Sequence, residues 1–149
     1  MTTDAVLRVD PVSGFYDFSL DEYGDIETAD FFDTAILYSI LGERRASASE
    51  MVEPQSRRGW LGNNSHFENG SKLWLYSQAR LTRDNLNRIQ DEAKKCLQWM
   101  VDDGLAVSIG QIKASVSNGW VLLDIPIRRS RDKVERKLFE LWENTGNVK

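Results

Sequence analysis

The fold is decided by residues 113–127, KASVSNGWVLLDIPI, which surround the dipeptide Asn118-Gly119. Asn-Gly between alternating apolar residues is the strongest short-range signal for a two-residue β-hairpin turn. A turn at this point pairs apolar residues across two antiparallel strands: Val116 with Val121, Ala114 with Leu123, and Ile112 with Ile125. These six side chains share one face, as the core side of a sheet requires. The pattern predicts a C-terminal β-hairpin within an antiparallel sheet.

The opposite face of this hairpin carries a mixture of polar and apolar residues. Lys113 lies opposite Asp124, which is an attractive pair, whereas two serines lie opposite Trp120 and Leu122. Because this face is half apolar, we expect a helix or a binding partner to cover it. Trp120 and Leu122 are therefore candidate interface residues.

Apolar spacing outside the hairpin predicts helices. Residues 30–45 and 82–103 repeat apolar side chains every three or four positions, and Thr28 or Asp30 and then Thr82 can cap them. A short helix is expected over residues 71–76. A last helix is expected to start at Ser130, and four apolar residues lie on one side of it: Val134, Leu138, Leu141 and Trp142.

Strands are expected at three further places. Residues 5–9 and 15–20 predict short strands, and residues 105–116 predict one long strand with a β-bulge near Gly110. This order of elements indicates the α+β class, with a small antiparallel sheet and a C-terminal β-hairpin packed against about three to four helices. The 149 residues are expected to form a single domain over 1–149, with a long loop at 46–70.

The loop at 46–70 shows no apolar period and is far longer than the usual connection of ~4–6 residues. It carries Arg57, Arg58 and Trp60 among glycines and asparagines. Trp and Arg dominate the binding energy of protein interfaces, so these three residues are candidate anchors for a partner. The alternative is that Trp60 packs onto the core of its own domain while the arginines are solvated.

Composition and charge limit the compartment and the partners. No apolar run approaches the ~20 residues that cross a bilayer, so no membrane partner is expected. The single cysteine, Cys96, and an N-terminus without features of a secretory signal favour a reducing cytoplasm. Nine acidic residues and no Lys or Arg lie between Val9 and Glu43, whereas basic residues predominate after Pro126. This asymmetry suits docking between oppositely charged surfaces, and it equally suits two solvated faces.

Catalytic and metal-binding chemistry has little support in the residues. The only histidine, His66, lies in the irregular loop, and one His with one Cys is too few for structural zinc. Cys96 lies on the inner stripe of the expected helix 82–103 and is interpreted as core. No catalytic residue, metal or cofactor is expected. Two alternatives remain open: a small glycan hydrolase that uses paired carboxylates, and a nucleic-acid-binding module, which the overall acidity opposes.

Four stretches of the chain, taken together and in order, resemble a known family. They are GDIETADFFDTAILYSILGERRA at 24–46, RRGWLGN at 57–63, GSKLWLYSQARLT at 70–82 and QWMVDDGLA at 98–106. The set resembles the baseplate proteins named for the gene 46 product of phage Mu. The resemblance covers the chain from about Gly24 to the last expected element.

The resemblance implies a non-enzymatic structural protein of a contractile phage tail, located in the virion baseplate and assembled in the bacterial cytoplasm. It implies similarity to sheath initiators, which lie close to the tail tube, bind baseplate wedge proteins and offer a sheet edge to strands of the tail sheath protein. It implies no nucleic-acid partner. T-even relatives carry Glu-Pro-Arg where the long helix gives way to a strand, whereas this chain has Asp102-Asp103-Gly104. Asp102 and Asp103 are therefore interface candidates by position alone.

Overall fold

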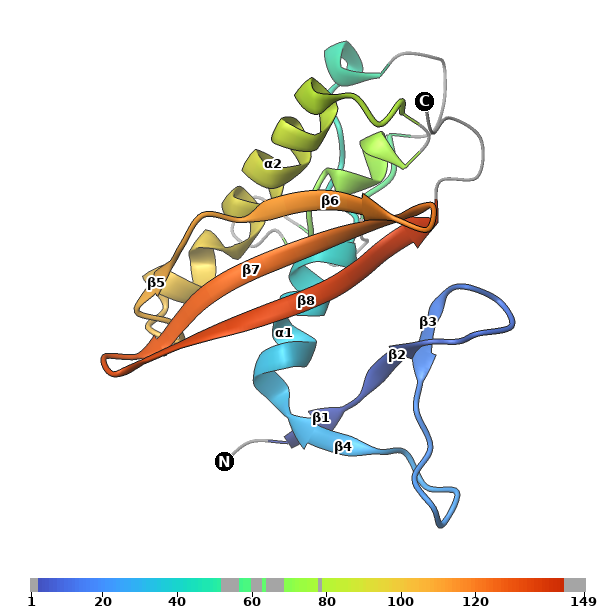
Figure 1. Cartoon of the computed structure of the whole chain (residues 1–149), viewed down its shortest axis with the longest axis vertical. Coiled ribbons are helices and arrows are strands. Elements are labelled where there is room, and N and C mark those ends of the chain that lie inside the picture. Colours follow the sequence, from blue (N-terminus) through green and yellow to red (C-terminus); the bar gives the residue numbers. More distant parts are fainter. Residues whose placement is uncertain (1–2, 52–56, 60–62, 64–68, 78, 144–149) are drawn as a thin grey trace.

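A computed structural model describes residues 3–51, 57–59, 63, 69–77 and 79–143 of the chain (Figure 1). Within these residues a twisted antiparallel sheet lies against two α-helices, and a strand-built arm projects from the N-terminal side. The elements, with η for short 3₁₀ helices, are β1 (Thr3–Ala5), β2 (Leu7–Val9), β3 (Tyr16–Phe18), β4 (Thr28–Asp30), α1 (Phe31–Leu41), η1 (Ala48–Glu50), η2 (Leu73–Tyr76), α2 (Arg83–Asp102), β5 (Ser108–Ile109), β6 (Lys113–Ser117), β7 (Trp120–Ser130) and β8 (Lys133–Glu143).

The predicted hairpin is confirmed as β6 and β7. Val116 is opposite Val121 and Ala114 is opposite Leu123, in the register that the Asn-Gly turn requires. Asn118 and Gly119 both have positive φ angles, 51° and 82°, as a tight hairpin turn of this kind demands. The third expected pair falls outside the ladder, because β6 begins at Lys113, yet the side chains of Ile112 and Ile125 are both buried.

The predicted C-terminal helix is wrong, because residues 133–143 form strand β8 along the whole length of β7. Their apolar residues fit a helical spacing, but in the strand they divide between two faces: Phe139 packs against the core, whereas Leu138 is 73% exposed. Pairing with β7 satisfies main-chain groups that the buried β7 strand would otherwise leave unpaired. A register shift between Val121 and Leu122 absorbs one extra residue.

The number of helices expected from the sequence is therefore too high. The described residues contain two α-helices and two single-turn 3₁₀ helices, so the expectation of three to four helices is corrected to two. The predicted short helix at 71–76 corresponds to η2, one tight turn. The α+β mixture remains, with more strand than was expected.

The two α-helices form where the sequence predicts them. The Asp30 carboxylate accepts a hydrogen bond from the Phe32 amide at 3.2 Å, and the Thr82 hydroxyl accepts one from the Asn85 amide at 3.2 Å, so both caps are confirmed. α1 ends at Leu41, four residues before the expected end. Both helices pack against the inner face of the sheet, and their core residues are Phe32, Ile36, Ile40, Ile89, Ala93, Cys96, Leu97 and Met100.

The single long strand expected over residues 105–116 is also wrong. The segment pairs with β7 twice, as β5 and as β6, and leaves the ladder between them. At the break, the Gly110 amide donates to the Pro126 carbonyl at 2.8 Å, and an added Cβ at Gly110 would lie 2.9 Å from Pro126 Cγ. The break thus needs glycine where the chain passes the proline ring.

Residues 3–30 build a forked arm that stands away from the helices and the sheet (Figure 1). β1 pairs with β4 at the base, and β2 pairs with β3 in the first prong, which turns at residues 10–15. A bridge between Leu20 and Ile26 closes the second prong, which turns at residues 21–25. The short strands expected at 5–9 and 15–20 lie within this arm, in smaller pieces.

Candidate functional site

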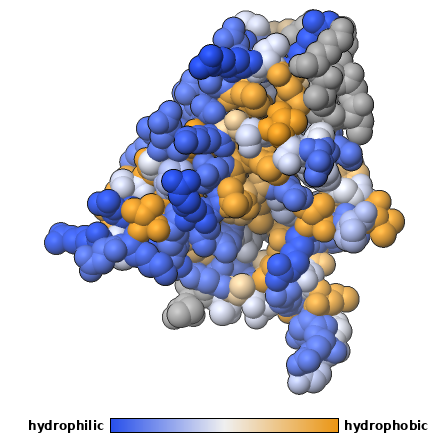
Figure 2. Space-filling view, viewed as in Figure 1, coloured by the Kyte–Doolittle hydropathy of each residue, from blue (hydrophilic) through white to orange (hydrophobic). Residues whose placement is uncertain are grey.

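The outer face of the sheet carries the predicted interface residues Trp120 and Leu122, and no described helix covers it. The helices lie on the opposite face, so the expectation that a helix might shield Trp120 and Leu122 is not met. Both side chains are half-buried in the sheet itself, and Leu138 of β8 projects beside them. Figure 2 shows apolar residues interspersed with polar ones over this side of the molecule. An apolar strip of this kind is typical of a surface that binds another protein.

Charged residues border this apolar strip. The Arg136 guanidinium lies 3.0 Å from the Asp124 carboxylate, across the β7–β8 pair, while Lys113 lies opposite Asp124 on β6. Arg136 is mostly exposed, so the pair contributes little to folding stability. These charged side chains therefore contribute little to folding stability and are better suited to orienting a bound partner.

Along the outer edge of β8, one main-chain group, the Glu140 carbonyl, has a hydrogen-bond partner among the described residues of the arm. The Tyr16 hydroxyl donates a hydrogen bond to the Glu140 carbonyl at 2.6 Å, which means that this carbonyl points away from β7. In a regular antiparallel ladder, every second residue points its N–H and C=O to the same side. The ladder is regular from Glu140 back to Val134, so Leu138 and Arg136 also direct their main-chain groups outward.

A groove of about 450 Å³ separates this edge from the forked arm. Its walls are Leu7 and Val9 of β2 on one side and residues 138–140 of β8 on the other, with Leu37 of α1 at its base. Burial, and then the Glu140 carboxylate, raise the pKa of Tyr16 to about 12, so the hydroxyl stays protonated and remains a donor at neutral pH. The groove has two strand edges as walls, which is the geometry that an extended peptide requires.

The loop arginines are held by their own domain. The Arg57 Nε donates to the Ala46 carbonyl at 2.6 Å, and the Ala46 amide donates to the Arg57 carbonyl at 3.0 Å. Arg58 forms an ion pair with Glu43 at 2.7 Å, and its guanidinium lies 4.8 Å from the centre of the Trp74 ring. Trp60 lies outside the described residues. From the sequence, both arginines were expected either to anchor a partner or to be solvated. Neither expectation included these contacts within the domain.

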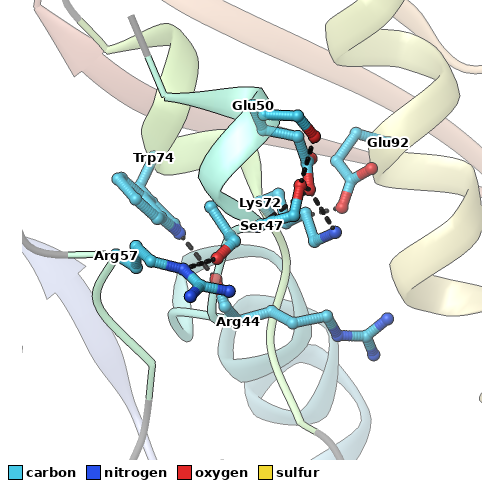
Figure 3. A network of polar contacts seen from close by, with 9 residues as sticks. Arg44, Ser47, Glu50, Arg57, Lys72, Trp74 and Glu92 are labelled. Carbon is cyan, nitrogen blue, oxygen red and sulfur yellow. Dashed lines mark hydrogen bonds and ion pairs between the residues drawn. The ribbon is translucent and has the colours of Figure 1, made fainter. Parts of the chain in front are cut away.

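A polar network fixes the segment to which Arg57 is joined (Figure 3). Trp74 donates through Nε1 to the Arg44 carbonyl at 2.9 Å, and Lys72 forms an ion pair with Glu50 at 2.9 Å. The Ser47 hydroxyl and then the Lys72 ammonium lower the pKa of Glu50 to about 2. Residues 44–50 and 72–74 are thus joined by one side-chain to main-chain hydrogen bond and one ion pair between side chains. Together with the Arg57 contact they form a rigid support for the adjacent loop.

Asp102 and Asp103 lie at the C-terminal end of α2, close to β5 and remote from the turn that carries Trp120 (Figure 1). Both are exposed. Gln98 donates to the Asp102 carboxylate at 3.2 Å, and the Asp103 amide donates to the Trp99 carbonyl at 2.8 Å. The structure therefore does not join them with Trp120, Leu122 or the loop arginines into one continuous site.

The described residues were expected to hold neither a metal site nor a reactive cysteine. They contain no group of three or more His, Cys, Asp or Glu residues that could hold a metal ion. Burial raises the pKa of the Cys96 thiol to about 12, so Cys96 is a core residue as expected. His66 lies outside the described part of the chain. None of the described helices is long and apolar enough to cross a membrane.

One protein family matches most of this chain. Residues 32–134 match the family described as Phage protein GP46. The chain belongs to this family. This match confirms the family resemblance that the four sequence stretches indicated. The matched region runs from the start of α1 to the first residues of β8.

Two curated members of the GP46 family are similar to this chain. The Mu-like prophage FluMu protein gp46 of Haemophilus influenzae is 36% identical over 87 residues, which are 57% of this chain and 64% of that protein. The Baseplate protein gp46 of Escherichia phage Mu is 32% identical over 106 residues, which are 69% of this chain and 73% of that protein. The match thus spans slightly less than two thirds of the Haemophilus protein.

Sequence reasoning missed two parts of this site. The outer edge of β8 was hidden, because its residues were interpreted as a helix. The forked arm was interpreted as ordinary short strands, although six of its large apolar side chains are exposed: Val12, Phe15, Phe18, Leu20, Tyr23 and Ile26. The signal for the arm was the spacing of its turn residues, because two turns lie within 17 residues. No strand expected between them is long enough to bury the apolar side chains of this stretch.

Proposed function

We propose that this protein is a structural, non-enzymatic component of a contractile phage tail baseplate that binds wedge proteins and nucleates the tail sheath. The baseplate role in the virion is the one that the resemblance implies, and family membership and the relative from phage Mu bear it out. The partners and the nucleation of the sheath are the part that we propose.

The observation that best supports sheath nucleation is the outer edge of β8. Residues 134–138 offer alternate N–H and C=O groups to a further strand, beyond the Glu140 carbonyl that Tyr16 already binds, and the neighbouring groove can accept such a strand. A strand added there gains main-chain hydrogen bonds without any change of the existing sheet. In this proposal the sheath protein supplies the strand.

The other predicted interface residues have separate places in the proposal. Trp120 and Leu122 lie on the outer face, where a wedge protein can bury their exposed parts. Arg57 and Arg58 hold the start of the loop that carries Trp60, so Trp60 is the proposed anchor and the arginines its support. Asp102 and Asp103 form a separate contact at the other end, and contact with the tail tube is proposed only for the assembled baseplate.

The competing functions lack a comparable observation. A glycan hydrolase needs one carboxyl group with a raised pKa beside a second carboxylate. Every described carboxylate with a resolved shift has a lowered pKa: Asp10, Glu27, Asp30 and Glu50. A nucleic-acid module needs free basic side chains near an aromatic platform, whereas Arg58 is paired with Glu43 and packed on Trp74.

The proposal is tested with the tail sheath protein of the same phage or prophage. Leu138→Pro removes an outward main-chain donor while it leaves the ladder to β7 intact, and Leu138→Thr changes the same side chain without loss of the donor. We expect the proline variant to lose seeded sheath assembly in light scattering and electron microscopy, and the threonine variant to keep it. Equal seeding by both folded variants excludes the β8 edge as the nucleus.

A further inference from the structure

Exposed apolar residues are concentrated on the forked arm. Val12 and Phe15 on the first prong are 93% and 76% exposed, and Tyr23 on the second prong is 82% exposed. Figure 2 shows apolar side chains at the surface of the arm. The prongs are held by main-chain bonds and turn hydrogen bonds, so their apolar tips are presented to a partner and do not form a core of their own.

The arm is also strongly acidic. Residues 3–30 contain eight acidic residues and a single basic residue, Arg8, which pairs with Glu27 at 2.8 Å. Asp21 accepts hydrogen bonds from the amides of Tyr23 and Asp25 and thereby shapes the second turn. Glu22 and Asp25 form no ion pair with any described residue. The tips therefore combine apolar side chains with unpaired negative charge, which selects a partner surface that is both apolar and basic.

The chain itself carries such a surface away from the tips of the two prongs. The turn between β7 and β8 and its flanking residues, 128–133, are here called the basic turn. Arg129 of this segment pairs with Asp30 at the base of the arm, and Asp132 is acidic. Three basic residues remain at its surface: Arg128, Arg131 and Lys133. The three are exposed, and neither Arg128 nor Arg131 forms an ion pair with a described residue. Val134 is 53% exposed beside them, and the Val107 amide donates a hydrogen bond to the Arg128 carbonyl at 2.7 Å. Figure 1 shows the basic turn on the side of the molecule away from the tips of the two prongs.

We propose that the forked arm of one copy binds the basic turn of a second copy, head to tail. The prong tips and the basic turn match in charge and in apolar character, and within one chain it is the base of the arm, through Asp30 and Arg129, that contacts this turn. A contact between different surfaces of identical chains is heterologous, so it repeats and produces a ring or a filament of subunits. The proposal does not depend on sheath nucleation, because it concerns the isolated protein.

The test measures self-association by sedimentation velocity over a concentration series. For the wild type we expect the mass to rise with concentration at about 50 mM salt, and to fall back toward one chain at about 500 mM, where surface charges are screened. A mass of one chain at every concentration in low salt overturns the proposal.

Charge reversal makes the test specific. Glu22→Lys with Asp25→Lys changes the arm and leaves Asp21 to form the turn, while Arg131→Glu with Lys133→Glu changes the basic turn. Each double variant alone should weaken self-association at least about tenfold, whereas an equal mixture of the two should associate again, because each reversed surface then meets an opposite charge.

Lys94→Glu with Lys95→Glu on the exposed side of α2 is the matched control, since it alters net charge as much as the basic-turn variant does. Circular dichroism checks that all variants are folded. The proposal is overturned if the control weakens association as strongly as the two reversals, or if the mixture of reversed variants stays monomeric.

Discussion

The Tyr16 hydroxyl lies 2.6 Å from the Glu140 carbonyl and joins the forked arm to the outer edge of β8. Within the described residues, the main chain of β8 from Val134 to Glu140 forms no other hydrogen bond with the arm. Natural proteins protect such edges, because unpaired strands invite association. Tyr16 therefore marks the place where the arm contacts the edge, beside the stretch where we propose that a partner strand adds.

Tyr16→Phe should loosen this protection at small cost to the fold. Loss of one hydrogen bond lowers the free energy of unfolding by about 0.5–1.5 kcal/mol, measurable in urea. With the carbonyl freed, binding of a sheath-derived strand peptide should become tighter in titration calorimetry. Weaker binding would show that the hydroxyl belongs to the partner site instead.

Leu97→Ala should test the core that α2 forms with the sheet. Leu97 is fully buried, so its truncation should cost about 2–5 kcal/mol in urea unfolding. Gln98→Ala, one residue further on the exposed side of the helix, should change stability by less than about 0.5 kcal/mol. Similar losses for both would contradict the packing of α2.

Glu50 should make stability depend on acid pH. Its pKa is lowered to about 2 in the folded protein, from an unfolded value near 4.5. A lowered folded pKa stabilises above the unfolded pKa, and this contribution is lost as the pH falls from about 4.5 to about 2. Glu50→Gln should therefore flatten the fall in melting temperature over this window. An unchanged slope would mean that the Ser47 and Lys72 contacts do not form in solution.

Trp60→Ala should distinguish whether Trp60 anchors a partner or packs in the core of its own domain. If Trp60 is an anchor supported by Arg57 and Arg58, the variant should lose capture of wedge proteins in a pull-down while its melting temperature stays close to the wild type. A large fall in melting temperature would assign Trp60 to the core. Trp74→Ala is the comparison, because Trp74 binds the Arg44 carbonyl and should destabilise the fold.

The parts of the fold that depend on neighbouring residues could be predicted from the sequence. Asn118-Gly119 sets its own turn and register, and Asp30 and Thr82 cap helices through adjacent amides. Residues 133–143 could not be assigned in this way. Their spacing fits a helix as well as a strand, and the choice was made by pairing with β7.

The candidate site was predictable only in part for the same reason. Trp120 and Leu122 follow from the hairpin register, which local sequence specifies. The internal contacts of Arg58 with Glu43 and Trp74 join residues far apart in the chain, so no local pattern indicates them. The exposed side chains of the arm, such as Phe15 and Tyr23, have the composition of core strands, and only the fold shows that nothing described covers them.

The central claim, that β8 offers an open edge to a strand of the sheath protein, is tested most directly by amide hydrogen exchange measured by NMR. In the free protein, the amides of Arg136 and Leu138 should exchange rapidly, whereas those of Lys137 and Phe139, which face β7, should be protected. On binding of the sheath protein, the two outward amides should become protected as well. Outward amides that still exchange rapidly in a saturated complex would contradict the claim.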